Sequence, residues 1–456
     1  MRLVSRNPFT GQVMEEFEAM SFEDSAREIL RSRQAFLSWK KASVQERGGL
    51  LKALSRGLRD QQRTFAEMVT REMGKPIGQS LAEIEKCAWL SDYFAENSAK
   101  FLQEEMVETD ALKSYVALEP LGIILGIMPW NFPFWQVFRF AIPALMAGNV
   151  CVLKHASNVP LTALAIEKLF QDSGMPDHVF KTLLVDSQTT MQLIERELVD
   201  GVSLTGSVEA GAEVASIAGR HIKKFVLELG GSDPFIVLED ADIAKTARMA
   251  LQARMINSGQ SCIAAKRFMA LGTIAKPFTE ALERELKTVK IGDPMDPATT
   301  IGPLAKREFV GVLSGQLEDA ERKGARVVYG PDPPPGNGFF FRPSIVTKVR
   351  PDMRIVTEEV FGPILPVLVV ESEADLVKMA NASSYGLGAS IWTRDLARAE
   401  KLARELEAGF VAVNDTVKSD PRLPFGGIKK SGIGRELSHY GLKEFMNIKS
   451  VVIKGA

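Results

Sequence analysis

The sequence has 456 residues, of which 45% are hydrophobic and 25% charged, and its formal net charge is −1. At roughly 150 residues per domain, this length predicts two or three domains, and the composition is ordinary for a globular enzyme. The near-zero charge excludes a global field favouring nucleic acid or an anionic membrane. Three cysteines cannot build a disulfide framework, and no metal-ligand spacing is found among the four histidines (His155, His178, His221, His439).

No segment reads as a leader or a membrane span. The amino-terminal stretch MRLVSRNPFTGQVMEEF lacks an apolar signal core. The most apolar region, residues 121–153, is interrupted by prolines and by Arg139, and no clean run reaches about 18 residues. We therefore expect a cytoplasmic protein without a membrane partner, in which 121–153 is buried core around a functional loop.

The first quarter of the chain is expected to be a short hairpin followed by helices. Residues 4–17 indicate two short strands around a Pro/Gly turn. Residues 22–73 carry helical periodicity with breaks near Ser43 and Gln61, and a further helix is expected from about 80 to 100. Residues 114–129 are rich in Val, Ile and Tyr and predict strands.

From about residue 148 onward, strands and helices alternate. Apolar strand segments at 149–157, 180–186, 201–207 and 224–231 are separated by helical segments at 160–174, 189–199 and 208–219. Such alternation predicts a parallel, doubly wound sheet. A second alternating set, from 233 to about 432, predicts a second α/β domain. The tail, 445–454, is expected to be a lone strand that needs a partner, which another subunit could supply.

Several segments carry residues that are unusual for their surroundings. Cys262 lies within NSGQSCIAAKR, among small and polar residues with Lys266 and Arg267 behind it, as a reactive thiolate would require. A lone cysteine is more often a small core residue, and Cys87 and Cys151 fit that description. Glu228 in LELGG is harder to explain structurally, because carboxylates are seldom buried without a role or a partner.

Taken together and in this order, the unusual segments resemble the aldehyde dehydrogenase superfamily. The resemblance begins at NPFTG and continues through PWNFP (129–133), LTGSVEAG (204–211), LELGG (227–231) and GQSC (259–262). Further on come EEVFGPI (358–364) and LPFGGIKKSGIGRE (423–436). The resemblance thus covers nearly the whole chain.

The resemblance implies a covalent mechanism with three catalytic residues. Cys262 would attack the aldehyde carbon, because a thiolate is a good nucleophile near neutral pH. Asn131 and the backbone N–H of Cys262 would hold the developing oxyanion. Glu228 would then act as general base for the water that hydrolyses the thioester. Relatives that pass the acyl group to coenzyme A generally lack this glutamate, so Glu228 favours a free acid product.

The expected cofactor is a nicotinamide dinucleotide. Gly206, Ser207 and Gly211 follow a predicted strand and open a helix, where backbone and helix N-terminus can approach phosphate. The resemblance places Trp130 near the cofactor. It also places Glu359 at the nicotinamide ribose and Phe361 at the nicotinamide ring.

The choice between NAD and NADP is expected to depend on the end of the strand at 149–157. Lys154 would contact the adenosine ribose, although a solvated strand end is an equally good structural explanation. NAD-preferring relatives often have a carboxylate three residues later, where this chain has Ser157. Ser157 removes that repulsion and can donate to a 2′-phosphate. NADP is therefore favoured, and NAD is possible.

Three residues are expected to select the aldehyde. Asn131, Trp135 and Arg139 are spaced four apart, so a helix after Pro133 would put Trp135 and Arg139 on one face. Arg139 could anchor a substrate carboxylate through a bidentate contact, or it could be a buried arginine paired with an acidic neighbour. Together with Ser419, these residues resemble the short bacterial succinate-semialdehyde dehydrogenase branch.

Other functions remain open at this point. Another short ω-carboxylated or aliphatic aldehyde would use the same residues. A cofactor-independent cysteine hydrolase would leave LTGSVEAG and EEVFGP without a purpose. A non-catalytic structural protein would be expected to lack Cys262, Glu228 or Asn131, and all three are present.

The resemblance also implies the domain organisation. A Rossmann-like cofactor-binding domain would comprise 1–104 and 123–230, and an α/β catalytic domain 231–435. A small β oligomerisation extension would comprise 105–122 and 436–456. It implies a homodimer or homotetramer acting on a small-molecule substrate, with no nucleic acid or metal.

Overall fold

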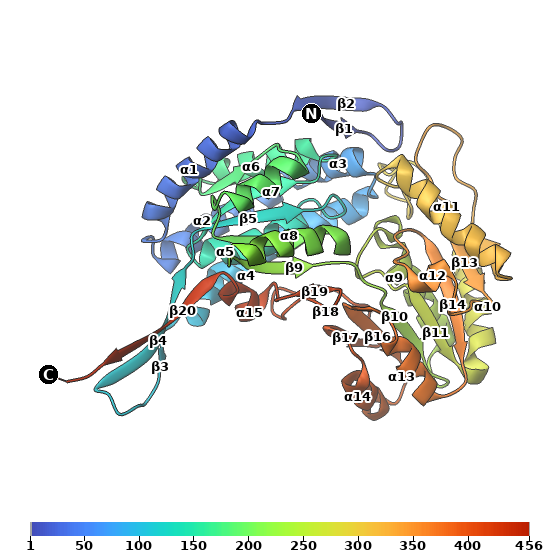
Figure 1. The fold of residues 1–456 in the computed structure, drawn as a ribbon. Coiled ribbons are helices and arrows are strands. Elements are labelled where there is room, and N and C mark those ends of the chain that lie inside the picture. The colour runs from blue at the N-terminus through green and yellow to red at the C-terminus, as the bar shows by residue number, and fades with distance from the viewer. Residues whose placement is uncertain (1, 456) are drawn as a thin grey trace.

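The computed structural model describes residues 2–455. It contains two α/β units side by side and a thin β arm that projects from the first unit (Figure 1). The predicted hairpin is confirmed, because β1 (Arg2–Arg6) pairs antiparallel with β2 (Val13–Glu18). The predicted helical region is also confirmed, with helices α1 (Phe22–Trp39), α2 (Val44–Asp60), α3 (Gln62–Met73) and α4 (Ile77–Phe101).

The helix breaks follow from local chemistry. Ser43 begins α2 with a capping box, in which its side chain accepts from the N–H of Glu46 and the Glu46 carboxylate accepts from the N–H of Ser43. Gly74 ends α3 in the left-handed conformation, with φ of 83°, which glycine adopts at low cost.

The first unit is built on a six-stranded sheet in the order β19-β9-β8-β5-β6-β7. The strands β5 to β9 are parallel, as predicted. The elements are β5 (Ile123–Met128), α5 (Trp135–Met146), β6 (Val150–His155), α6 (Pro160–Asp172), β7 (Phe180–Thr182), α7 (Ser187–Glu195), β8 (Gly201–Thr205), α8 (Val208–Arg220) and β9 (Lys224–Glu228).

The second unit is a seven-stranded sheet in the order β12-β13-β14-β11-β10-β16-β17. Its first elements are β10 (Pro234–Val237), α9 (Ile243–Met255), η1 (Ile256–Gly259), β11 (Arg267–Leu271), η2 (Gly272–Ile274), α10 (Ala275–Leu286) and α11 (Arg307–Arg322). The remainder are β12 (Arg326–Tyr329), β13 (Ser344–Thr347), α12 (Arg354–Thr357), β14 (Ile364–Val370), α13 (Glu373–Asn381), β16 (Gly388–Trp392), α14 (Leu396–Glu405) and β17 (Phe410–Val413).

The chain returns from the second unit to the first before residue 435. Strand β15 (Tyr385–Gly386) pairs with β18 (Ile428–Lys429), and β19 (Gly432–Ile433) pairs antiparallel with β9 of the first sheet. Helix α15 (Ser438–Lys443) then contacts α4 and α5. The division into domains stays a prediction, but by these pairings 432–443 packs with the first unit.

The arm is a three-stranded antiparallel sheet in the order β20-β4-β3. Strand β20 (Met446–Ile453) pairs along its whole length with β4 (Lys113–Pro120), and β3 (Glu105–Met106) lies on the other side of β4. The tail strand therefore has a partner within its own chain, and no second subunit is needed to pair one of its edges. Its other edge is the end of the sheet (Figure 1).

The apolar region at 121–153 forms the centre of the first unit, as predicted. All twelve residues of α5 are buried, and they pack between the sheet and the helices α2 and α4. A search of residues 2–455 finds no helix long and apolar enough to cross a membrane.

Candidate active site

The candidate residues of the first unit gather at one edge of its sheet. Strand β5 ends before the loop that carries Asn131, β6 ends at His155, β8 leads into Gly206, and β9 ends at Glu228. The chain continues from β5 to β6 and β7 on one side and then to β8 and β9 on the other. Ligands of doubly wound sheets bind at such a reversal, beyond the carboxyl ends of the strands.

The loop that carries Asn131 is fixed by buried polar groups on both sides. His155 Nε2 lies 2.9 Å from the carbonyl oxygen of Pro133, while its Nδ1 accepts from the N–H of Ala156. Burial lowers the pKa of His155 to about 4, so the ring is neutral and Nε2 carries the proton. On the other side, Glu83 Oε1 on α4 accepts from the N–H groups that open α5. Glu83 in turn is paired with the buried Lys75.

The Asn131 side chain joins this loop to the nucleophile loop. Its Nδ2 donates to the carbonyl oxygen of Gln260 at 3.1 Å, and Asn257 Nδ2 donates back to the Asn131 carbonyl at 2.7 Å. The backbone of Asn257 and Ser258 adopts left-handed φ angles of 51° and 56°, which are uncommon outside glycine. The loop thus stores strain, as functional loops often do.

Arg254 binds the backbone of the loop that carries Cys262. This fully buried side chain donates to the carbonyl oxygens of Val360 (2.7 Å) and Ala265 (3.0 Å), and also to Gly362. The nucleophile segment and the EEVFGP segment, about a hundred residues apart in sequence, are therefore held together by one guanidinium. Gly259 allows their close approach, because a Cβ there would clash with the carbonyl oxygen of Gly362.

The charge around Cys262 differs in its effect from what the sequence suggested. Lys266 is close, and its Nζ donates to the carbonyl oxygens of Ser261 (3.0 Å) and Cys262 (2.6 Å). Arg267 points away and donates to the backbone carbonyl oxygen of Ser232 and to two carbonyl oxygens in the last turn of α13. Burial outweighs the attraction of Arg139 and Lys266 and raises the pKa of Cys262 to about 11. In the ligand-free protein the group is therefore a thiol at neutral pH.

Glu228 belongs to a buried cluster with Arg139 and Glu436. Arg139 Nε forms an ion pair with Glu436, and its Nη2 donates to Thr205 Oγ1 at 3.3 Å. Burial raises the pKa of Glu228 well above its usual value; Arg139 opposes this shift and Glu436 adds to it. Because one guanidinium faces two carboxylates, the cluster favours holding a proton at neutral pH. Glu228 Oε1 has no hydrogen-bond partner within the described chain.

Aromatic rings form one wall of the crevice. Trp130 stacks on Phe309 with ring centroids 5.2 Å apart and meets Phe361 edge-on at 5.9 Å. Glu359 lies next to them, where its Oε1 accepts from the N–H of Gly231 at 3.1 Å and lies 3.2 Å from Lys266 Nζ. The structure therefore brings Trp130, Phe361 and Glu359 close to the Cys262 segment.

The remaining expected cofactor residues lie at the ends of β6 and β8. Ser207 caps α8 by accepting from the N–H of Ala210 at 3.2 Å. Gly211 must be small, because a Cβ there would lie 2.6 Å from Leu229. Lys154 is half-buried on β6, and burial together with Lys306 lowers its pKa. The helix N-terminus, the cation and the aromatic wall along one crevice fit a dinucleotide.

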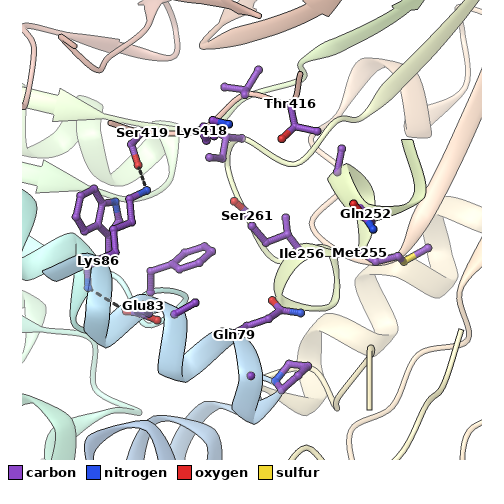
Figure 2. A pocket seen from close by; sticks show the side chains of 18 of the residues that line it. Gln79, Glu83, Lys86, Gln252, Met255, Ile256, Ser261, Thr416, Lys418 and Ser419 are labelled. Carbon is purple, nitrogen blue, oxygen red and sulfur yellow. Dashed lines mark hydrogen bonds between the residues drawn. The ribbon is translucent and has the colours of Figure 1, made fainter. Parts of the chain in front are cut away.

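A cavity of about 600 Å³ runs from Cys262 to the other predicted substrate residues. Trp135, Arg139 and Ser419 all line it, together with side chains from α4, α9 and the loop after β17 (Figure 2). Trp135 and Arg139 do share a face of α5. Arg139 has the acidic partner that its structural explanation requires, in Glu436, and it also lines the cavity. Its contact with a substrate carboxylate stays a prediction.

Sequence reasoning did not identify several residues of this site. Lys86 and Glu83 reach the cavity from α4, which carries no recognisable motif. Their helical spacing put them on one face, but nothing in the sequence indicated which element that face would meet. Phe309, Arg254 and Glu436 also escaped notice, and only Glu436 lies within a quoted motif. Among residues 2–455, no group of three or more His, Cys, Asp or Glu side chains is placed to hold a metal ion.

Comparison with known proteins gives consistent results over the whole chain. The model of the aldehyde dehydrogenase family matches residues 2–451. A probable succinate-semialdehyde dehydrogenase [NADP(+)] of Synechocystis sp. is 44% identical, over 99% of this chain and 100% of that protein. The succinate semialdehyde dehydrogenase [NAD(P)+] of Escherichia coli K12 is 40% identical, over 98% of this chain and 97% of that protein. The crystal structure of succinic semialdehyde dehydrogenase from Streptococcus pyogenes with NADP+ superimposes with a TM-score of 0.96 at 36% identity, covering 99% and 100%.

Proposed function

The chain belongs to the aldehyde dehydrogenase family, and we propose that it oxidises succinate semialdehyde to succinate with NADP+ as the favoured oxidant. The observation that carries the proposal is the cavity, whose mostly apolar lining includes Cys262 together with the positively charged side chains of Lys86, Arg139 and Lys418. The relatives named above are described as acting on the same substrate.

Cys262 is the proposed nucleophile. Its sulfur adds to the aldehyde carbon, and the carbonyl oxygen becomes an oxyanion. Asn131 Nδ2 lies on the loop facing the nucleophile and can turn from Gln260 to the oxyanion, while the backbone N–H of Cys262 supplies a second donor. Because the thiol has a pKa of about 11 in the ligand-free protein, it must transfer its proton to water in the cavity as substrate and cofactor bind.

The cofactor, when bound, accepts the hydride that leaves the former aldehyde carbon, and a thioester on Cys262 remains. Glu228 is the proposed general base for the water that hydrolyses it. Its buried position raises its pKa towards the range in which it can exchange a proton with water. Arg139, through its pair with Glu436, helps determine how readily Glu228 gives up that proton.

Substrate selection is proposed to rest on Trp135, Arg139 and Ser419. Trp135 supplies an apolar wall for the two methylene groups, and the Arg139 and Ser419 side chains supply donors for the remote carboxylate. Cofactor selection is proposed to rest on Lys154 and Ser157. A serine beside a lysine accommodates a 2′-phosphate, whereas a carboxylate at residue 157 would repel it.

The assembly and its location are part of the proposal. Two arms pair through the outer edges of β20, giving a homodimer, or a homotetramer that is a dimer of such dimers. The three cysteines are unpaired, which fits the reducing cytoplasm.

The direct test is the initial rate of reduced-nicotinamide formation with succinate semialdehyde, comparing NADP+ with NAD+. We expect a higher kcat/KM with NADP+ and loss of turnover in Cys262→Ala at unchanged Tm. Arg139→Ala is expected to raise KM for succinate semialdehyde. Equal rates on uncharged aldehydes would remove the substrate from the proposal, and no reduced cofactor with any aldehyde would contradict the whole reaction.

A further inference from the structure

The charged side chains that line the Cys262 cavity differ in whether their charge is matched. Glu83, Lys86, Arg139 and Lys418 line it. Glu83 is paired with Lys75, Arg139 with Glu436, and Lys418 with Asp415. Within the described residues 2–455, Lys86 is the one charged lining residue with no ion-pair partner within 4 Å.

Lys86 is nevertheless held in a defined place. Its Nζ donates to Ser419 Oγ at 2.8 Å and lies 4.2 Å above the centroid of the Trp135 ring (Figure 2). These contacts join α4, α5 and the loop after β17, whose positions in the sequence are far apart. A lysine held by a hydroxyl and an aromatic face keeps its position while two of its three ammonium hydrogens remain available.

The surroundings of Lys86 destabilise its charged form in the absence of a bound anion. Burial and the repulsion of Arg139 lower the pKa of Lys86 to about 8; Cys87, Asp420 and Glu83 oppose the shift without contacting the ammonium. The group is thus charged below about pH 8 and loses its charge above it. A ligand carboxylate would stabilise the charged form and restore the missing partner.

We propose that Lys86, together with Ser419, binds the remote carboxylate of the substrate and contributes at least as much as Arg139 to the selection of a carboxylated aldehyde. This inference rests on the proposed function. The Arg139 charge is already compensated by Glu436 next to Glu228, so Arg139 serves both the general base and the cavity. Lys86 has no such second partner, and its ammonium faces the same cavity as the Cys262 sulfur.

The test compares Lys86→Met, which keeps the apolar stem, with Lys86→Arg and with Lys100→Met. Lys100 is an exposed lysine in the last turn of the same helix and serves as the matched control. The kcat/KM of each variant is measured with succinate semialdehyde and with its uncharged methyl ester. Equilibrium binding of succinate, measured by calorimetry, gives a readout that does not depend on turnover.

For Lys86→Met we expect a loss of about 10- to 100-fold in kcat/KM for succinate semialdehyde, as for one hydrogen bond to a charged group. The loss should appear mainly in KM, with kcat and the methyl-ester reaction unchanged, and succinate binding should weaken in parallel. Lys86→Arg should retain most of the preference, and Lys100→Met should match wild type.

Three outcomes would overturn the inference. If Lys86→Met keeps the wild-type preference for the carboxylated aldehyde, Lys86 does not bind the carboxylate and the proposed function stands without it. If both aldehydes lose kcat/KM equally, Lys86 acts only on the fold. If wild type itself shows no preference between the two aldehydes, the proposed substrate is wrong and the inference is wrong with it.

Discussion

The two ends of the Cys262 cavity differ in the structural elements that form them and in how their charged side chains are paired. At the reaction end, Asn131 and Glu228 are buried at the carboxyl ends of β5 and β9, and the partly buried Cys262 lies on the loop between η1 and β11. The far end, with Lys86, Trp135 and Ser419, is formed by helix faces and one surface loop, and the Lys86 side chain is half-buried. Lys266 is paired with Glu359 at the first end, and Arg139, which faces both Glu228 and the cavity, is paired with Glu436. At the second end, Lys86 has no ion-pair partner among residues 2–455.

This difference separates chemistry from recognition. At the reaction end, burial has a larger effect on the pKa values than the neighbouring charges have. Burial therefore raises the pKa of both Cys262 and Glu228. Cys262 is therefore a thiol before substrate arrives, and burial shifts Glu228 towards its protonated form, so the reactivity of both groups depends on binding. At the far end, an uncompensated ammonium makes the cavity receptive to an anion before any reaction begins.

Of the substitutions that test this comparison, Glu228→Gln is expected to cause the largest loss of turnover. The substitution keeps the shape of the side chain and removes the base, so the thioester should form but not hydrolyse. Turnover should fall by about 10²- to 10⁴-fold, while the first turnover survives. Rapid mixing with NADP+ should show a burst of about one reduced cofactor per site. A loss of the burst itself would place Glu228 before hydride transfer.

Asn131→Ala is expected to act on the same end with a smaller effect. Removing one oxyanion donor should lower kcat by about 10²- to 10³-fold. KM should change little, because the far end of the cavity is intact. Asn131 also links two loops through Gln260, so Tm is measured beside kcat. A loss confined to KM would mean that Asn131 binds the ground state rather than the oxyanion.

Ser157→Asp tests recognition in the cofactor crevice, apart from both ends of the cavity. The new carboxylate should repel a 2′-phosphate beside Lys154 and reduce the preference for NADP+ over NAD+ by about 10- to 100-fold. Quenching of protein fluorescence on titration with each cofactor reports binding without turnover. An unchanged ratio of the two affinities would remove Ser157 from cofactor selection.

The smallest expected effect is a divergence of pH profiles. The thiol at the reaction end has a pKa of about 11, so kcat/KM for an uncharged aldehyde should rise from pH 7 to pH 10 as the thiolate fraction grows. Lys86 loses its charge as pH rises through about 8. The ratio of kcat/KM for succinate semialdehyde over its methyl ester should therefore fall above pH 8. A constant ratio across this range would contradict a titrating lysine at the far end.

Much of the framework was predictable because it rests on local signals. The helix after Pro133, the strand–helix alternation from 149 to 231 and the caps at Ser43 and Ser207 all follow from periodicity and capping chemistry. Cys262 and Glu228 stood out because their residue types sit poorly in a plain core, whereas Asn131 was identified only through the resemblance to the aldehyde dehydrogenase family.

The rest depended on contacts between distant segments. Lys86 and Ser419 are 333 residues apart, and only the fold places an α4 lysine against that loop. Periodicity likewise cannot predict the ion pair between Arg139 and Glu436, or the hydrogen bonds from Arg254 to the EEVFGP segment. The expected effect of Lys266 on Cys262 failed for a related reason: burial, which depends on the whole fold, exceeded the charge effect that sequence proximity suggested.

The most direct test of covalent oxidation at Cys262 uses the Glu228→Gln variant. The variant reacts with succinate semialdehyde and NADP+, is quenched with acid during the burst, and its mass is then measured. The account predicts one succinyl group on the peptide that contains Cys262, formed only when NADP+ is present. An unmodified Cys262 peptide, or the same adduct without NADP+, would contradict the covalent oxidation of this substrate at Cys262.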